Sequence, residues 1–168
     1  MFSIAAAAML ICGGLWTRPS LHAQVVPALP PIERLVVEKS ARRILAYADG
    51  HVVYTIYNIQ LGGAPVGKKR FQGDEKTPEG DYTIDYGNPR SAYHLSLHIS
   101  YPDAGDNAYA ARAGRSAGGD IFIHGQPNDL PSGRPGGDWT DGCIAVSNEQ
   151  IEALWSAVPE GTPIHIQP

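Results

Sequence analysis

The sequence predicts one mainly β domain with one or two short helices. Short runs of β-branched and aromatic residues recur along the chain, and glycine, proline or aspartate separates them. Only two stretches carry the capping residues and apolar spacing of helices. A length of 168 residues with 43% hydrophobic residues suits one core and is too short for two ordinary domains.

The predicted strands begin with a β-hairpin. The runs 43–48 and 51–57 flank Asp49-Gly50, a dipeptide that favours a type I′ turn because both residues tolerate positive φ. Thr77-Pro78-Glu79-Gly80 then predicts a turn before the alternating run 81–86. Further strands are expected at 95–100, 121–124, 144–146 and 163–167.

The clearer of the two predicted helices follows Ser147-Asn148-Glu149-Gln150, which has the pattern of a capping box. Its apolar face would consist of Ile151, Leu154, Trp155 and Val158, before Pro159 and Gly161 end it. A shorter helix is expected around 107–113, with Asp106 as N-cap and Gly114 as terminator.

The N-terminal segment predicts export to the periplasm or cell envelope. Residues 2–16 are apolar or small, a run short of the roughly 20 residues of a membrane span. We interpret residues 1–23 as a signal peptide. Because no Lys or Arg precedes the apolar run, an uncleaved N-terminal anchor is the alternative. The Pro-rich residues 24–31 predict a linker, and 32–168 the folded domain.

Charge and cysteine usage narrow the class of function. The formal charge is −4, and the longest basic run is Lys68-Lys69-Arg70, interpreted as a solvated turn, so nucleic acid is not an expected partner. Of two cysteines, Cys12 lies in the predicted signal peptide and Cys143 would remain unpaired. Because an unpaired thiol in an oxidising compartment invites oxidation, its presence favours a chemical role.

A candidate nucleophile site lies in residues 120–148. His124 ends a predicted strand, and beyond a Gly/Pro-rich loop Cys143 directly follows Gly142. A thiol with a pKa of about 8.5 is mostly protonated at neutral pH, and an imidazole that takes its proton makes it a better nucleophile. Gly142 allows backbone N–H groups near Cys143 to face an oxyanion. The alternatives are a small buried hydrophobe at Cys143 and a backbone-bonded strand histidine at His124.

The motif His124…Thr140-Asp141-Gly142-Cys143 resembles the signature of the L,D-transpeptidase catalytic domain (YkuD-like) family. Asp141 stands where most members have histidine, which resembles a TDGC-type (YafK-like) subgroup. The resemblance extends over residues 32–167. The segments that carry it further are 39–62, 73–84, 95–102 and the GTPIHI near the end.

The resemblance implies an L,D-transpeptidase-like β-sandwich or barrel and acyl transfer on peptidoglycan stem peptides through a thioester on Cys143. His124 would be the base, oriented by the carbonyl of Gly125, and no metal or cofactor is implied. The family also contains hydrolases, so an L,D-carboxypeptidase or an amidase that releases a wall-attached protein is the alternative. A wall-attached lipoprotein is a further expected partner.

Other residues have less definite expected roles. Thr140, Asp141 and Gly142 are expected to support the site, and Asp141 either fixes His124 or the loop in place of the family histidine, or caps the turn. His98, Tyr101 and Trp139 are candidates for contacting substrate. Two readings from other classes stay open. One is a zinc peptidase using His94, His98, His124 and Asp141, and the other is a non-catalytic wall-binding module.

Overall fold

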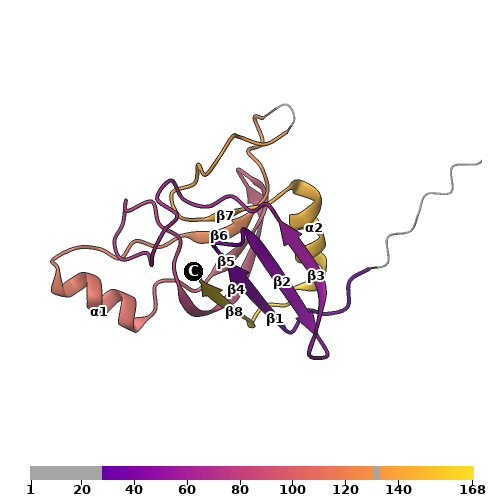
Figure 1. Cartoon of the computed structure of the whole chain (residues 1–168), viewed down its shortest axis with the longest axis horizontal. Helices are drawn as coiled ribbons and strands as arrows, with labels where there is room; N and C mark the ends of the chain where they lie inside the picture. Colours follow the sequence, from indigo (N-terminus) through magenta and orange to yellow (C-terminus); the bar gives the residue numbers. More distant parts are fainter. Residues whose placement is uncertain (1–27, 131–132) are drawn as a thin grey trace, which may run out of the picture.

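A computed structural model describes residues 28–130 and 133–168 of the chain. Within these residues eight strands form one sheet, and two helices accompany it (Figure 1). The strands are β1 (Arg34–Glu38), β2 (Arg43–Ala48), β3 (His51–Tyr57), β4 (Gly80–Ser91), β5 (His94–Ile99), β6 (Ile121–His124), β7 (Ile144–Ala145) and β8 (Thr162–Gln167). The helices are α1 (Ala104–Arg112) and α2 (Asn148–Ala157).

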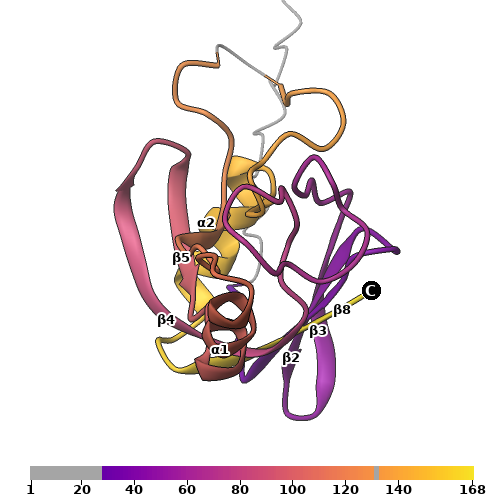
Figure 2. The ribbon, with the colours of Figure 1, turned by 90° about the vertical axis from the view of Figure 1, so that its left-hand side faces the viewer.

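The sheet has the order β3-β2-β1-β8-β4-β5-β6-β7 and curls into a half-barrel. Figure 2 shows β4 and β5 on one side, β2, β3 and β8 on the other, and α2 between them. Neighbouring strands are antiparallel except for the pairs β1–β8 and β6–β7, which are parallel. The core is aliphatic, with side chains from both arms of the sheet and from α2 fully buried, among them Leu35, Ile44, Ile84, Ile123, Ile151 and Leu154. The mainly β, single-domain prediction is confirmed.

Local sequence signals explain most of the elements. Asp49 and Gly50 have φ of +49° and +75°, as a type I′ turn between β2 and β3 requires. Ser147 caps α2 in a complete capping box with Gln150, as its sequence predicts. The strand β1 escaped prediction because its short apolar run, between Arg34 and Glu38, carries no alternation that marks a half-buried strand.

Helix α1 begins one turn earlier than its sequence suggested. Asp103, not Asp106, is the N-cap, and Asp106 is the third helical residue of a reciprocal capping box. The two aspartates compete for the same role in the sequence. Asp106 is 4% exposed and pairs with Lys68 at 2.9 Å and with the hydroxyl of Tyr82 at 2.8 Å, so its carboxylate serves the core and the helix end together.

The predicted signal peptide, residues 1–23, lies outside the described residues, as does part of the predicted linker. In the described part of the chain, neither helix has the length and apolar character needed to cross a membrane.

Candidate active site

His124 occupies the last position of β6 and is held from several directions. Its side chain is 3% exposed, and Nδ1 lies 2.7 Å from the carbonyl oxygen of Gly125. A carbonyl oxygen only accepts hydrogen bonds, so Nδ1 carries the hydrogen and the neutral ring presents Nε2 as a lone pair. The rings of Tyr93 and Trp139 lie 4.5 Å and 5.7 Å from the imidazole. Burial lowers the pKa of His124 below 6.5, against the opposite effect of the Gly125 carbonyl.

The first residue of α2 fixes the turn that carries this carbonyl. Gln126 N–H donates to the side-chain oxygen of Asn148 at 2.8 Å, while Gly125 N–H donates to Leu95 at 3.2 Å. A Cβ at position 125 would lie 2.6 Å from the same Asn148 oxygen, so only glycine fits there. Helix α2 thus orients His124 indirectly: Asn148 holds the backbone of Gln126, and the adjacent Gly125 carbonyl holds the imidazole.

Cys143 directly precedes β7, the strand that pairs with β6. The parallel register pairs Ile123 with Ile144 and His124 with Ala145, so Cys143 is level with Phe122. Side chains alternate along strands, which puts Cys143 and His124 on one face, with Cα atoms about 8 Å apart from strand spacing and rise. Phe122 N–H donates to the sulfur at 3.4 Å, and Sγ lies 3.5 Å from the Asp120 carbonyl.

The surroundings of Cys143 favour the protonated thiol over the thiolate. Burial raises the pKa of Cys143 to about 11. The Phe122 N–H and the ammonium of Lys69 lower the pKa, whereas the charges of Asp141 and Asp120 raise it further. At neutral pH, Cys143 is therefore a thiol and His124 a neutral imidazole, not a thiolate and an imidazolium.

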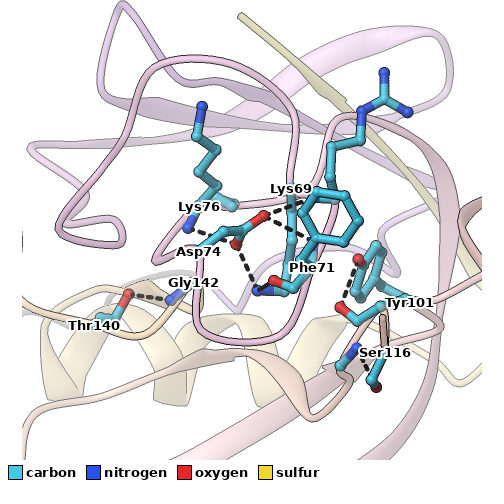
Figure 3. A network of polar contacts seen from close by, with 12 residues as sticks. Lys69, Phe71, Asp74, Lys76, Tyr101, Ser116, Thr140 and Gly142 are labelled. Carbon is cyan, nitrogen blue, oxygen red and sulfur yellow. Dashed lines mark hydrogen bonds and ion pairs between the residues drawn. The ribbon is translucent and has the colours of Figure 1, made fainter. Parts of the chain in front are cut away.

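The turn before Cys143 is braced by Thr140. Its hydroxyl donates to the Cys143 carbonyl at 2.8 Å and accepts from Gly142 N–H at 3.2 Å, as Figure 3 shows for the second bond. Gly142 has φ of +128°, and a Cβ there would lie 2.5 Å from the Lys76 carbonyl oxygen. The turn is hydrogen-bonded on its other side to Leu61, through Thr140 N–H at 3.1 Å.

Two cavities are both lined by His124 and Cys143. The larger, about 580 Å³, is lined by His124 and Cys143 together with Lys69, Trp139 and Asp141, among others. The smaller, about 250 Å³, shares His124 and Cys143 and continues toward β4 and β5; its further lining includes Asn88, Ser91, Ser96 and Phe122. Tyr93 and Asp120 line both cavities. The sulfur and the imidazole are therefore reachable from two sides.

Of the other predicted site residues, Trp139 and Asp141 lie at the larger cavity, whereas Tyr101 and His98 do not. Trp139 lines the larger cavity, and its indole N–H is buried without an acceptor among the described residues. Asp141 is exposed at the same cavity. It does not fix His124 within the described structure. A carboxylate can only accept a hydrogen bond, and Nδ1, the ring nitrogen that carries the hydrogen, already donates to the Gly125 carbonyl.

Tyr101 requires a correction. It is 2% exposed, and its hydroxyl donates to the carbonyl of Ala117 at 3.0 Å, so it is a core residue and not part of a substrate surface. His98 lines neither of the two cavities as the described residues form them. It stacks on Tyr86 at 4.5 Å, bonds Asp85 at 2.6 Å and reaches the smaller cavity only through Phe122.

The histidines of the zinc alternative do not converge. His94 bonds Glu152 at 2.7 Å, His98 bonds Asp85, and His124 bonds a backbone carbonyl. In the described part of the chain, no three His, Cys, Asp or Glu side chains gather as metal ligands would.

Two residues at the site were missed or misread from the sequence. Tyr93 precedes β5 in a turn with no motif to mark it, and only the fold brings it against His124. Lys69 was interpreted as part of a solvated turn, but it is 3% exposed and lines the larger cavity. Its unusual burial depends on Asp74, which pairs with it at 2.9 Å and lies five residues later.

Comparison with known proteins decides the family. The model of the L,D-transpeptidase catalytic domain, YkuD, matches residues 32–166, most of the chain. The chain belongs to the L,D-transpeptidase catalytic domain family. Its sequence is 29% identical over 104 residues to YafK of Escherichia coli (strain K12), covering 61% of this chain and 36% of YafK.

Solved structures agree with this L,D-transpeptidase fold. Pgp2 of Campylobacter jejuni, described as a helical cell shape determining protein, is 26% identical with a TM-score of 0.63, over 82% of this chain and 48% of Pgp2. An L,D-transpeptidase of Xylanimonas cellulosilytica shares the fold at 19% identity and a TM-score of 0.51, over 84% of this chain and 63% of that one. The chain thus spans about half or less of YafK and Pgp2.

Proposed function

We propose that this L,D-transpeptidase domain performs acyl transfer on peptidoglycan stem peptides through a thioester on Cys143. The observation that carries the proposal is the locked tautomer of His124, which leaves Nε2 as a base on the same strand face as the sulfur. Both groups line two cavities, which suits a reaction with two successive partners.

The acylation step follows from the neutral pair. As Sγ attacks a diamino-acid carbonyl in the stem peptide, the thiol proton moves to Nε2 of His124. We assign the oxyanion to the backbone N–H of Cys143, because the N–H of Gly142 is engaged by Thr140. When the C–N bond breaks, the imidazolium returns its proton to the leaving amine, and the thioester remains.

The second nucleophile decides the outcome. An amine from a neighbouring stem would give a cross-link and restore the thiol, whereas water would give a free stem carboxylate and restore the thiol. An attached protein would leave as the amine of the acylation step, before water acts. We favour transfer, because a second cavity beside the sulfur offers a place for an acceptor amine. Hydrolysis by the same residues is the second candidate.

The biological setting is proposed on the same basis. A stem-peptide enzyme works in the cell envelope, and the apolar residues 2–16 suit a signal for export. Wall-attached lipoprotein is a further proposed substrate or product. Pgp2 is described as a helical cell shape determining protein, so control of cell shape is a proposed consequence of the activity here.

The test is incubation of purified muropeptides with wild type and Cys143→Ala, with products read by mass spectrometry. Dimers indicate transfer, and shortened or released stems indicate hydrolysis; both should disappear in the variant. His124→Gln should lose activity, whereas His165→Gln, which removes a histidine bonded to Asp81 outside both cavities, should keep it. Activity that survives Cys143→Ala but not a chelator would favour a metallopeptidase. Unchanged muropeptides with wild type would favour a wall-binding module.

A further inference from the structure

The larger cavity contains a cation that the acyl-transfer steps do not use. Lys69 is 3% exposed and lines this cavity with His124 and Cys143. Its ammonium donates to Asp74 at 2.9 Å and to the carbonyl of Phe71 at 3.2 Å. An ammonium carries three hydrogens, and the third has no acceptor among the described residues.

Asp74 fixes Lys69 in place without consuming its donor capacity. One carboxylate oxygen of Asp74 accepts from Arg70 N–H at 2.7 Å and Phe71 N–H at 2.9 Å, and the other accepts from Lys69 and from Lys76 N–H at 3.2 Å (Figure 3). Burial by itself would raise the pKa of Asp74, but these hydrogen bonds hold it below its ordinary value. The loop therefore presents a pre-positioned ammonium at the cavity wall.

The remaining charges of the cavity are of a different kind. Asp120 and Asp141 are exposed, so water and salt screen their carboxylates. Lys69 is buried, where a charge acts in a lower effective dielectric. Its charge also reaches the sulfur, since it lowers the pKa of Cys143 against the larger effect of burial. An anion bound there would lie beside the reacting carbonyl.

We propose that Lys69 is a specificity-determining residue that binds a free carboxylate of the substrate peptide, on the residue released by cleavage. The inference rests on the proposed acylation of Cys143. A terminal carboxylate one residue beyond the attacked carbonyl lies about 3.5 Å further along an extended chain, which a cavity shared by Lys69 and Cys143 accommodates. A lysine that only braces its loop would be indifferent to the end of the peptide.

The experiment compares two stem peptides that differ only in a C-terminal carboxylate or carboxamide. Acylation of Cys143 is followed by intact-protein mass spectrometry, and kcat/KM by release of the terminal residue. For wild type, amidation should lower kcat/KM on the order of 10- to 100-fold, as expected for one hydrogen bond to a charged group. In Lys69→Met both peptides should react equally and slowly. Lys69→Arg should recover part of the discrimination.

Lys76→Met is the matched control. Lys76 belongs to the same loop, but its ammonium bonds the carbonyl of Val66 at 2.9 Å and does not line the cavity. In Figure 3 its side chain points away from Asp74. This variant should discriminate between the two peptides as wild type does.

The outcomes separate the two proposals. Equal acylation of wild type by both peptides would overturn the role of Lys69 and leave the cysteine mechanism intact, and this comparison needs no variant to fold. Discrimination that persists in a folded Lys69→Met, checked by thermal unfolding, would overturn it as well. Absence of acylation with either peptide would contradict the proposed function itself, and the role of Lys69 with it.

Discussion

His124 ends β6 and Cys143 directly precedes the neighbouring strand β7, yet their surroundings hold the two residues in different ways. The imidazole is fixed through its own atoms, by the Gly125 carbonyl at 2.7 Å and by the rings of Tyr93 and Trp139. Among the described residues, the hydrogen bonds of the sulfur are long, at 3.4 Å and 3.5 Å, and are made with backbone groups. Its position is set instead by the backbone of the preceding turn, which Thr140 braces.

The imidazole of His124 and the sulfur of Cys143 therefore depend on different parts of the molecule. The His124 side depends on side-chain packing around a strand end. The Cys143 side depends on close backbone approach between segments far apart in sequence, because Gly142 packs on the Lys76 carbonyl and Gly62 on the Glu75 carbonyl. Changes to the turn before Cys143 should therefore act on the proposed nucleophile, and changes to the side chains that pack on His124 should act on the proposed base.

Gly142→Ala should give the largest effect, because it breaks the nucleophile side through the backbone. The new Cβ meets the Lys76 carbonyl at 2.5 Å, at a φ of +128° that alanine rarely adopts. We expect a loss of about 2–4 kcal/mol in the free energy of unfolding and at least about a 100-fold loss in the rate of Cys143 acylation. Urea unfolding and intact-protein mass spectrometry measure the two.

Gly161→Ala is the control for backbone strain without a clash. Its φ is +88°, but nothing lies within 4 Å of the new Cβ. It should cost about 1 kcal/mol in the free energy of unfolding and leave acylation unchanged. Equal acylation by Gly142→Ala and wild type would show that the turn does not set the position of the sulfur.

Thr140→Val should weaken the same side through hydrogen bonds. The variant keeps the shape of the side chain but leaves the Gly142 N–H and the Cys143 carbonyl without their partner, at 5% exposure of residue 140. We expect about 1–3 kcal/mol lower free energy of unfolding and about 10- to 30-fold slower acylation. Thr140→Ser keeps the hydroxyl and should acylate nearly as wild type; a Ser variant as slow as Val would argue that the methyl group, not the bonds, matters.

Tyr93→Leu should weaken the His124 side more mildly. Removing the ring 4.5 Å from the imidazole loosens its orientation and admits water, so kcat should fall by about 5- to 10-fold. The acid limb of the pH profile is the range in which activity falls as His124 becomes protonated. Because burial depresses the pKa of His124, added water should raise the midpoint of this limb toward 6.5. Tyr93→Phe should behave as wild type.

Tyr86→Leu is the matched control for Tyr93, because Tyr86 stacks on His98 at the same 4.5 Å, outside the two cavities. It should leave kcat and the acid limb unchanged. An unshifted acid limb in Tyr93→Leu would mean that Tyr93 lines the cavity without positioning the base.

The smallest effect concerns pH. The reactive form pairs a neutral thiol, whose pKa is raised to about 11, with a neutral imidazole, whose pKa lies below 6.5. As pH falls through the His124 pKa the base is protonated and kcat/KM falls, whereas between pH 7 and pH 9 it should change by less than about 3-fold. Iodoacetamide should alkylate Cys143 more slowly at pH 7 than a free cysteine. Faster alkylation would indicate a thiolate–imidazolium pair.

Features that depend on residues adjacent in the chain could be predicted before the structure was known. Asp49-Gly50 turns the hairpin because both residues accept positive φ, and Ser147 with Gln150 starts α2 because the two side chains satisfy adjacent backbone groups. His124, Thr140, Gly142 and Cys143 were named as candidates from their order in the chain and its resemblance to the family motif, and their catalytic roles stay a prediction.

Which side chains are buried against one another became clear from the folded chain alone. It put Lys69 in the cavity wall, Tyr93 on the imidazole and Tyr101 in the core, and it left His98 outside both cavities. The placements of Tyr93, Tyr101 and His98 depend on contacts with other segments of the chain, whereas Lys69 is also held by Asp74, five residues later. A local pattern shows how a residue can fold, but the environment of its charge or ring is set by whichever remote backbone packs against it.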